Sequence, residues 1–582
     1  MSQKRLRKNR NLERPASVNS GVVKETRILL PGVVEIIKNN WVFLLLTCLV
    51  SLVLYANALN GAFVSDDYAT IPNNPLIGDF WATMKSFPGN SMPLSNYVVF
   101  KLFGHSSPVP YHITSLLMYM LVLVLIFVFV EIVFKNRLLS QVTTLIFTFH
   151  PIHVEAVSWN AGRIYLILSA YMLLSVINLI YFLDRDKPKY LVYGMLFFLL
   201  AILTDRPRPF AIFLIIILYV VSQQNWDILE KYKKYFWLIL ASLVISVLIS
   251  LPLINDRIVA VNSGVNASTN IFYNPILQYP VSIAKYLKLL WMPLNLTLYH
   301  TMYVLPTWLN WLITLNYLVL LVYFYIKDKR YFFALAFIFI ATAPSMAPVK
   351  VSWLVAERYM FLGSLGFCLF LALILTDLWK KSKFITPLLL ILLLAFYGWR
   401  VYQRNIDWST NHNLWVNTCQ VSPNSHNAWN NIGDDYDKLG QYENSIKGFT
   451  QSVLVKPNYA DAYHNRGNVL YKIKRPDLAK ESYETAVNIN PNLYQTYLAL
   501  AQIAFDSHDP KTAKENLEKY MHFDAGNVQA YYSYALAQAQ LGEIEEAKQL
   551  LQQILTVYPN LVPVKESLKV LESGISFVPV QP

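Results

Sequence analysis

The stretch that decides the fold class is residues 41–68, WVFLLLTCLVSLVLYANALNGAFVSDDY. Its first part, 41–59, is almost entirely apolar, and about 20 such residues in a helix cross the hydrocarbon core of a bilayer. The run ends in ALNG (58–61), which is not a clear cleavage site, so we expect an uncleaved signal anchor. Two adjacent carboxylates, Asp66 and Asp67, follow a few residues later. The stretch therefore predicts a membrane-spanning helix that places an acidic pair near the membrane surface.

Composition divides the 582-residue chain into a membrane part and a soluble part. Only 15% of the residues are charged, whereas soluble domains carry about a quarter, and 55% are hydrophobic. The apolar residues concentrate before residue 400, and the chain beyond it is polar with helical periodicity. We therefore expect an all-α protein with a basic N-terminal segment (1–40), a transmembrane domain (41–400) and a soluble domain (401–576).

The distribution of positive charge indicates a membrane topology rather than a nucleic-acid site. The net charge is +13, but Lys and Arg gather in residues 1–40 and in short loops between apolar runs. Short basic loops stay in the cytoplasm. This arrangement predicts a cytoplasmic N-terminus, an extracytoplasmic C-terminal domain, no nucleic-acid partner and about eleven spans. The expected spans are 41–59, 111–134, 138–149, 163–183, 189–204, 207–222, 235–253, 306–326, 331–347, 358–376 and 383–399.

This topology gathers ionisable residues in five outward-facing loops. Ionisable side chains are costly at membrane depth, so they indicate function unless a partner neutralises them. In chain order the candidates are Asp66 and Asp67; His150, His153, Glu155 and Arg163; Arg206 and Arg208; Lys285 and Lys288; and Glu357 and Arg358.

These residue types suit the transfer of a sugar from a lipid phosphate to a hydroxyl. The reaction needs a base for the hydroxyl and cations for the departing phosphate. Asp66 or Asp67 is the candidate base, although such a pair is also typical of a turn or a helix cap. The candidate phosphate-binding residues are Arg163, Arg206, Arg208, Lys285, Lys288 and Arg358.

The remaining loop residues are expected to organise the site. His150 and His153 are three apart with a proline between them, which is not a specific spacing of metal ligands even with Glu155 nearby, so we expect no metal. Glu357 is adjacent to Arg358, and a mutual or helix-end ion pair is the alternative reading of that pair. The two lysines of the fourth loop are also three apart, opposite apolar residues, which predicts a helix lying in the membrane interface.

The soluble half carries an internal repeat. Prolines stand at 423, 457, 491 and 559, so the intervals are 34, 34 and 68 residues, and a period of 34 is that of the tetratricopeptide repeat. Aromatic residues and small residues recur in the same register. They are Trp429, Tyr463, Tyr497 and Tyr531, and Gly433, Gly467, Ala501 and Ala535. We expect four stacked repeats, preceded by a packing helix over 411–421 and closed by a helix over 563–572.

Several local motifs resemble the TMTC family, the transmembrane and tetratricopeptide-repeat O-mannosyltransferases of the GT-C glycosyltransferase class. The longest is HPIHVEAV (150–157), followed by Trp159, Gly162 and Arg163. The others are FVSDD (63–67), AERY (356–359) and RNIDW (404–408). The resemblance covers most of the chain from about residue 41.

The resemblance implies a GT-C helical bundle and an inverting protein O-glycosyltransferase. The donor would be a polyprenyl- or dolichyl-phosphate sugar, the acceptor a Ser/Thr hydroxyl of a protein presented by the repeats, and no cofactor would be needed. In the third loop, Thr204-Asp205-Arg206 stands where the family has Ser-Lys, and Arg206 or Arg208 would replace the charge of that lysine. Such departures leave the donor sugar, and activity itself, open. The short repeat array favours a prokaryotic cell membrane, with the endoplasmic reticulum as the eukaryotic alternative.

Two other functions remain open from the sequence. One is a polysaccharide polymerase or O-antigen-ligase-like enzyme, and the other is a non-enzymatic membrane scaffold built on the repeats. Within the glycosyltransferase hypothesis, neighbouring side chains of an extended loop point in different directions. We therefore expect one of Asp66 and Asp67 to be the base and the other to hold the loop, with a slight preference for Asp67 as the base.

Overall fold

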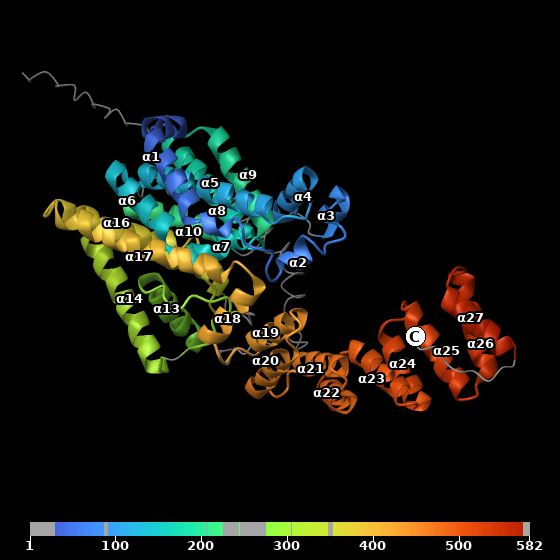
Figure 1. Ribbon diagram of the computed structural model, residues 1–582. Helices are drawn as coiled ribbons and strands as arrows, with labels where there is room; N and C mark the ends of the chain where they lie inside the picture. Colours follow the sequence, from blue (N-terminus) through green and yellow to red (C-terminus); the bar gives the residue numbers. More distant parts are fainter. Residues whose placement is uncertain are drawn as a thin grey trace, which may run out of the picture.

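The computed structural model describes residues 30–86, 91–205, 208–224, 244, 275–303, 305–346 and 353–573. The secondary structure in these ranges is helical, with turns and coil between the helices. A bundle of apolar helices forms one end of the molecule, and paired shorter helices extend away from it (Figure 1). The predicted all-α class and the division into a bundle and a repeat array are confirmed.

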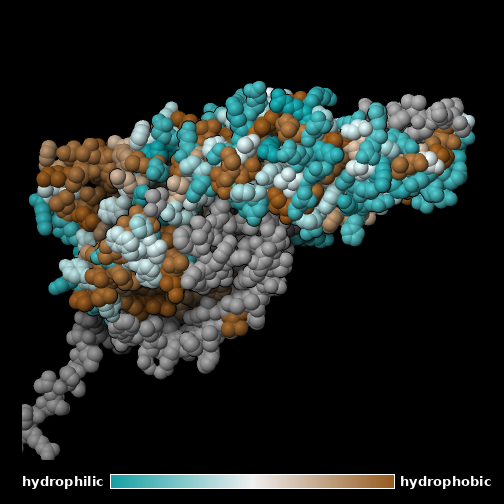
Figure 2. Space-filling view, turned by 90° about the horizontal axis from the view of Figure 1, so that it is seen from below, coloured by the Kyte–Doolittle hydropathy of each residue, from teal (hydrophilic) through white to brown (hydrophobic). Residues whose placement is uncertain are grey.

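Ten apolar helices build the bundle in the described residues. They are α1 (Val33–Leu54), α5 (Val109–Phe134), α6 (Arg137–Phe149), α8 (Arg163–Arg185), α9 (Pro188–Thr204), α10 (Ala211–Gln223), α14 (Thr307–Lys327), α15 (Lys329–Thr342), α16 (Ser364–Trp379) and α17 (Ile385–Asp407). Five of the helices in this part of the chain are long and apolar enough to cross a membrane: α1, α5, α8, α14 and α17. Hydrophobic surface gathers over the bundle, whereas the repeats are largely hydrophilic (Figure 2).

The helices follow the predicted spans with shifted ends. The first helix begins at Val33 rather than at 41, since residues 33–40 (VVEIIKNN), which mix apolar and polar side chains, are helical as well. The short third run forms α6, whose first turn is capped by Asn136, which accepts a hydrogen bond from the backbone N–H of Leu139 at 3.1 Å. The predicted span 235–253 lies outside the described residues except for residue 244.

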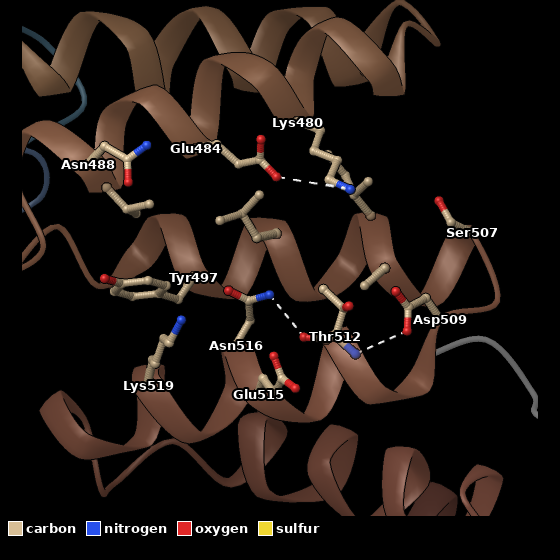
Figure 3. A pocket seen from close by; sticks show the side chains of 14 residues that line it. Lys480, Glu484, Asn488, Tyr497, Ser507, Asp509, Thr512, Glu515, Asn516 and Lys519 are labelled. Carbon is tan, nitrogen blue, oxygen red and sulfur yellow. Dashed lines mark hydrogen bonds and ion pairs between the residues drawn. The ribbon is translucent and has the colours of Figure 1, made fainter.

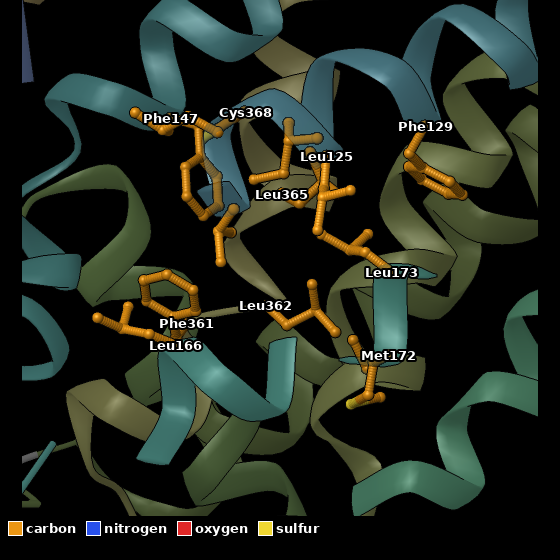
Figure 4. Packing of buried hydrophobic residues seen from close by; sticks show 14 of the residues in the cluster. Leu125, Phe129, Phe147, Leu166, Met172, Leu173, Phe361, Leu362, Leu365 and Cys368 are labelled. Atoms are coloured by element: carbon orange, nitrogen blue, oxygen red, sulfur yellow. The ribbon is translucent and has the colours of Figure 1, made fainter. Parts of the chain in front are cut away.

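The core of the bundle is packed from large aliphatic and aromatic side chains. Leu125, Phe147, Leu166 and Phe361 come from different parts of the chain and meet in it (Figure 4). Small residues bring two helices of the core together. A side chain at Gly366 of α16 would place its Cβ 2.5 Å from the carbonyl oxygen of Ala334 in α15. Such small residues are typical of helix contacts in membranes, where close backbone approach replaces hydrophobic driving force.

Five further helices lie toward the end of the bundle that faces the repeats (Figure 1). They are α2 (Asp67–Thr70), α3 (Phe80–Ser86), α4 (Ser91–Phe103), α7 (Val154–Ser158) and α13 (Pro275–Trp291). The last of these covers both lysines of the fourth loop, in agreement with the predicted helix there. Its apolar side packs with the fifth loop, because Tyr286 and Leu290 share a buried cluster with Val355 and Met360.

Eight helices form the four repeats as antiparallel pairs. The pairs are α19 (His426–Lys438) with α20 (Tyr442–Val455), α21 (Ala460–Lys472) with α22 (Pro476–Ile489), α23 (Gln495–Asp506) with α24 (Pro510–Phe523), and α25 (Val528–Gln540) with α26 (Ile544–Val557). They are flanked by α18 (Asn411–Val421) and α27 (Val562–Glu572). The recurring small residues let the paired helices approach closely, since a Cβ at Gly467 would lie 2.6 Å from the ring of Tyr483 in the paired helix.

The bundle and the repeats share one hydrophobic core. The last apolar helix, α17, continues past the expected boundary at 400 and ends only at Asp407. Leu414 and Trp415 of α18 and Ile432 of α19 belong to the same buried cluster as the helices of the bundle. The first repeat is therefore packed onto the membrane domain, and no stretch of extended chain separates the two.

Substituting Gly366 with alanine is expected to destabilise the bundle by about 1–3 kcal/mol, because the new methyl group would press on backbone atoms that cannot move aside. The check is the melting temperature of the detergent-solubilised protein. Gly398→Ala is the control, since its Cβ would meet only side-chain atoms, the ring of Phe149 at 3.3 Å and Leu54 at 3.5 Å. Equal melting temperatures for the two variants would contradict the proposed packing of α16 on α15.

Candidate active site

The structure separates the two adjacent carboxylates of the first loop. Asp66 is exposed, whereas Asp67 has no exposed surface. The Asp67 Oδ1 atom accepts a hydrogen bond from the backbone N–H of Ala161 at 2.8 Å. Its Oδ2 atom accepts from the backbone N–H of Val64 at 3.2 Å and from Nδ2 of Asn160 at 3.3 Å. Asp67 therefore ties the first outer loop to the second.

A local change of backbone direction produces this separation. The loop is not extended as we expected: Ser65 has a positive φ of 52°, and α2 begins at Asp67. Burial raises the pKa of Asp67 to about 7, although its three N–H partners and Arg163 act in the opposite direction. Among the described residues, no hydrogen bond or ion pair reaches the carboxylate of Asp66, which points to solvent.

Arg163 is fully buried at the start of α8, and all its donors are used inside the protein. Nε donates to Ser115 Oγ, Nη1 to Ser95 Oγ and Asn96 Oδ1, and Nη2 to the Tyr111 carbonyl and Asn160 Oδ1. A guanidinium has five N–H groups, so none is left for a phosphate in this structure. The hydrogen bonds of Arg163 join α4, α5 and the second loop, and they use the donors that we had expected to bind the phosphate.

The two histidines of the second loop hold it onto the bundle. The His150 Nδ1 atom accepts a hydrogen bond from the backbone N–H of Ile152, so its Nε2 carries the proton and donates to the Leu290 carbonyl at 3.1 Å. The Nε2 atom of His153 lies 2.7 Å from Ser364 Oγ. Both histidines are buried and face different partners, and the organising role that we expect for them stays a prediction.

The third and fifth loops bring two guanidinium groups to the same aromatic ring. Arg358 forms an ion pair with Glu155, which also accepts a hydrogen bond from the Arg358 backbone N–H at 2.9 Å. Arg208 forms an ion pair with Asp205. Tyr359 lies between the two, with its ring centre 5.0 Å from the Arg358 guanidinium carbon and 4.7 Å from that of Arg208. The predicted neighbour Arg206 lies outside the described residues.

Glu357 faces away from Arg358 and pairs with a residue that the sequence did not single out for a role in the site. Both its carboxylate oxygens accept from Nη2 of Arg404 at 3.3 Å, and its Oε1 also accepts from the Thr297 backbone N–H at 2.5 Å. The Nη1 atom of Arg404 donates to Asn417 Oδ1 in α18 at 3.1 Å. Glu357 and Arg404 have no exposed surface. The predicted alternative of a mutual Glu357–Arg358 pair is wrong.

The fourth loop adds further positive charge next to these pairs. Lys285 is half-buried, and its Nζ donates to the Met302 carbonyl at 3.2 Å, whereas Lys288 is exposed. Burial, followed by the neighbouring charge of Lys288, lowers the pKa of Lys285 to about 8. The Nε2 atom of His300 lies 3.2 Å from Oε1 of Glu357. Burial, followed by the charge of Lys285, lowers the pKa of His300 well below the usual value, which keeps it neutral.

An aromatic stack lies where the outer loops meet the first repeat. The ring of Tyr299 stacks on Trp353 at 4.1 Å between centroids and lies 5.7 Å from Trp415 of α18. Burial and then the Asp66 carboxylate raise the pKa of Tyr299, while Arg358 lowers it. Tyr299 is thus within electrostatic reach of both the exposed acid and the buried cation. The sequence gave no signal for Tyr299 or His300 as site residues, and Arg404 belongs to the RNIDW motif (404–408), for which we predicted no role in the site.

Substituting Asp67 with alanine is expected to loosen the first loop, because three N–H donors would lose their acceptor, each at a cost of about 1–3 kcal/mol if left unpaired. The measurement is amide hydrogen exchange, which should quicken roughly tenfold or more over residues 62–71. Asp66→Ala is the matched control and should leave that exchange unchanged. Equal exchange in both variants would refute the tie between the loops.

Comparison with protein-family models identifies the repeats. Family models described as tetratricopeptide repeats match residues 433–474, 460–493 and 504–563. Among solved structures, MamA is 20% identical, with 30% of this chain and 91% of that protein covered and a TM-score of 0.24.

Comparison with curated proteins reaches into the membrane domain. The human protein O-mannosyl-transferase TMTC3 is 24% identical over 465 residues, which cover 69% of this chain and 50% of that protein. The Caenorhabditis elegans protein O-mannosyl-transferase F38B6.6 is 22% identical over 445 residues, 70% of this chain and 62% of that protein. The chain thus spans about half the length of the human relative that it matches. The predicted resemblance is confirmed: the curated homologues of this chain are the protein O-mannosyl-transferases of the TMTC family.

Proposed function

We propose that this protein is a membrane-embedded protein O-glycosyltransferase that moves a sugar from a polyprenyl- or dolichyl-phosphate donor to Ser/Thr hydroxyls. Homologues named as protein O-mannosyl-transferases support a glycosyltransferase of this kind. The observation that carries the proposal is the solvent-facing carboxylate of Asp66, held at the outer loops by its buried neighbour and sharing the surroundings of Tyr299 with Arg358.

Asp66 is the base in this proposal, and Asp67 is the residue that positions it. A general base has to reach the proton that it removes, which an exposed carboxylate can do. A carboxylate that already accepts three hydrogen bonds inside the protein is poorly placed to accept a fourth from a substrate. This assignment reverses the slight preference for Asp67 that the sequence suggested.

Cations from three loops would bind the donor phosphate. Arg208 and Arg358 both lie against the ring of Tyr359, but each forms an ion pair with a carboxylate. The two arginines and their two carboxylates together therefore carry no net charge. The side chains of Lys285 and Lys288 supply the positive excess, since the hydrogen-bond partner of Lys285 is a neutral carbonyl. Together they can balance the phosphate as it leaves, where a preorganised positive environment stabilises the developing charge.

The reaction that fits these residues is a single displacement. Asp66 takes the proton of the acceptor hydroxyl while the oxygen of that hydroxyl forms a bond to C1 of the sugar. The bond between C1 and the phosphate oxygen breaks, and the electron pair leaves with the lipid phosphate, whose charge the cations hold. The configuration at C1 is inverted because the two oxygens lie on opposite faces. No metal ion takes part in these steps, and the buried histidines hold the second loop in place.

The membrane orientation follows from the same proposal. The basic loops between apolar helices would face the cytoplasm, and Asp66, the cations and the repeats would face the other side. The acceptor would then be a secreted or membrane protein presented by the repeats, and the donor would sit with its lipid in the bilayer. The hydrophobic surface over the bundle fits this placement (Figure 2).

Asp66→Asn is expected to lower sugar transfer by roughly a hundredfold or more, because the amide cannot take a proton. The assay follows a hexose from polyprenyl-phosphate mannose to Ser/Thr of a peptide, by mass spectrometry, with purified protein in nanodiscs. Asp79→Asn is the control: Asp79 is an exposed acid of the same loop that caps α3, and Asn caps a helix equally well.

Full transfer by Asp66→Asn would refute the assignment of the base. Sugar found only on lipid or polymer would favour a polymerase or ligase instead. No transfer by the unchanged protein with any lipid-phosphate sugar, together with loss of all cellular function on deletion of the repeats, would favour a scaffold.

Binding of the donor is expected to weaken as the pH rises from 7 to 9. Lys285 carries its charge below its pKa of about 8 and loses it above, whereas a phosphodiester keeps its charge throughout. Lys285→Arg should remove this alkaline weakening, since Arg stays charged. The measurement is the Kd of a fluorescent polyprenyl-phosphate sugar across that range, with Lys288→Arg as the control that keeps the weakening. An unchanged alkaline limb in Lys285→Arg would exclude Lys285 from the phosphate site.

A further inference from the structure

The two arginines that would bind the donor phosphate differ in how their carboxylate partners are held. The side chain of Glu155 has no exposed surface, and it accepts hydrogen bonds from both the backbone N–H and the guanidinium of Arg358. Asp205, the partner of Arg208, has 16% of its side chain exposed. Glu155 is therefore a fixed part of the interior, whereas Asp205 lies where its carboxylate can turn to solvent.

The stability of helix α9 does not explain why residue 205 is an acid. Asp205 is the C-cap of α9, and its backbone N–H donates to the Ala201 carbonyl at 2.9 Å. The C-terminal end of a helix carries a partial negative charge, so a carboxylate is unfavourable there. Thr204 fastens this end instead, since its hydroxyl donates to the Leu200 carbonyl at 2.8 Å and lies 3.0 Å from the hydroxyl of Ser91 in α4. The carboxylate of Asp205 is thus not needed for the position of its own backbone.

Arg208 is held in place by contacts other than its ion pair with Asp205. Its guanidinium carbon lies 5.0 Å from the ring centre of Tyr165 and 4.7 Å from that of Tyr359. The face of an aromatic ring attracts a cation, and a planar guanidinium packs well against it. The two rings would therefore keep Arg208 in position when its anionic partner changes.

The charge of the lipid phosphate changes during the proposed reaction. In the donor the phosphate is a diester with one negative charge. Once the sugar has left, it is a monoester whose second pKa is about 6, so it carries a charge of about −1.5 to −2 near pH 7. Arginine binds phosphate through strong and often bidentate hydrogen bonds. The same cations that stabilise the leaving phosphate would therefore slow the release of the lipid product.

We propose that Asp205 competes with the lipid phosphate for Arg208 and so assists the release of the lipid product. The carboxylate gives up the guanidinium when the donor binds and takes it back as the product leaves, so Arg208 exchanges one anion for another. This inference rests on the proposed function, because it assigns a step of product release to the same site. Asp205 acts through Arg208 and affects turnover rather than the displacement at C1.

The first experiment measures the binding of a fluorescent polyprenyl phosphate to the full chain in nanodiscs. Asp205→Asn should bind this lipid about tenfold more tightly, and the donor about threefold more tightly, because no carboxylate competes for Arg208. Asp205→Glu keeps the competing charge and should bind both lipids as the unchanged protein does. Equal melting temperatures confirm that the variants are folded. Unchanged or weaker binding of polyprenyl phosphate by Asp205→Asn would overturn the proposal.

An ion pair in the repeats provides the matched control. Lys480 lies 4.0 Å from Glu484 in α22, and both residues line a cavity of about 360 Å³ between α22, α23 and α24 (Figure 3). Glu484→Gln raises the net charge by the same amount as Asp205→Asn, and it should leave the binding of polyprenyl phosphate unchanged. Equal tightening in both variants would refute the proposal, because the net charge would then be the cause. Tighter binding of polyprenol, which has no phosphate, by Asp205→Asn would refute it too.

A double-mutant cycle tests whether Asp205 acts through Arg208. In the Arg208→Gln background, Asp205→Asn should tighten the binding of polyprenyl phosphate less than threefold, because the cation that both anions share is gone. The full tenfold effect in that background would show that Asp205 only repels the phosphate, and it would overturn the competition.

Turnover provides the second measurement and separates this proposal from the proposed function. Asp205→Asn should keep its single-turnover rate of sugar transfer within about twofold and lose about tenfold in the multiple-turnover rate, since product release then limits the reaction. A slower single turnover, or equal multiple turnover, would refute the role in release. Tighter binding as expected, with no transfer by the unchanged protein, would refute the transferase activity and leave the exchange at Arg208 standing. Transfer by the unchanged protein, with unaltered lipid binding by Asp205→Asn, would refute the exchange alone.

Discussion

The neighbouring residues Glu357 and Arg358 form buried ion pairs with two different partners, and the arrangement of the outer loops depends on these two pairs. Arg358 turns to Glu155 of the second loop, and Glu357 turns to Arg404 at the end of the last apolar helix. Removing one partner of such a pair leaves an uncompensated charge in a low-dielectric interior, at a cost of about 3–5 kcal/mol. Every loop that faces the candidate site is fastened directly or indirectly to this dipeptide.

The two ion pairs also connect the repeats with the loops of the candidate active site. Through Asn417, Arg404 reaches the helix that leads into the repeats, so the position of the repeats and the position of Arg358 are fixed by the same short segment. Asp67 makes a similar connection between the first loop and the second, since it accepts hydrogen bonds from Asn160 and Ala161. Two of the residues that would touch substrate, Asp66 and Arg358, each lie next to a buried carboxylate, that of Asp67 or of Glu155, which ties its loop to the second loop.

Much of this organisation could be predicted from the sequence. The apolar run after residue 40 and the 34-residue period of the prolines each repeat a simple pattern, so both domains and their order were foreseeable. The roles of Asp66 and Asp67 were not, because they depend on N–H groups more than ninety residues away in the chain. Arg163 was taken for a phosphate ligand because a lone arginine in a loop gives no sign that its five donors are already used. The apolar pattern of α17 ends before Arg400, but the helix continues to Asp407. The domain boundary that we expected at residue 400 therefore falls inside a helix.

The shared core between the bundle and the first repeat has a consequence for how an acceptor would be handled. A recognition domain on a flexible linker delivers its cargo with a probability set by linker length. Here residues of α18 and α19 belong to the core of the bundle, so the first repeat is held directly against it without a flexible linker. For an acceptor bound to the repeats as proposed, the number of residues between the bound stretch and the modified hydroxyl would be set by the fold rather than by the length of a linker.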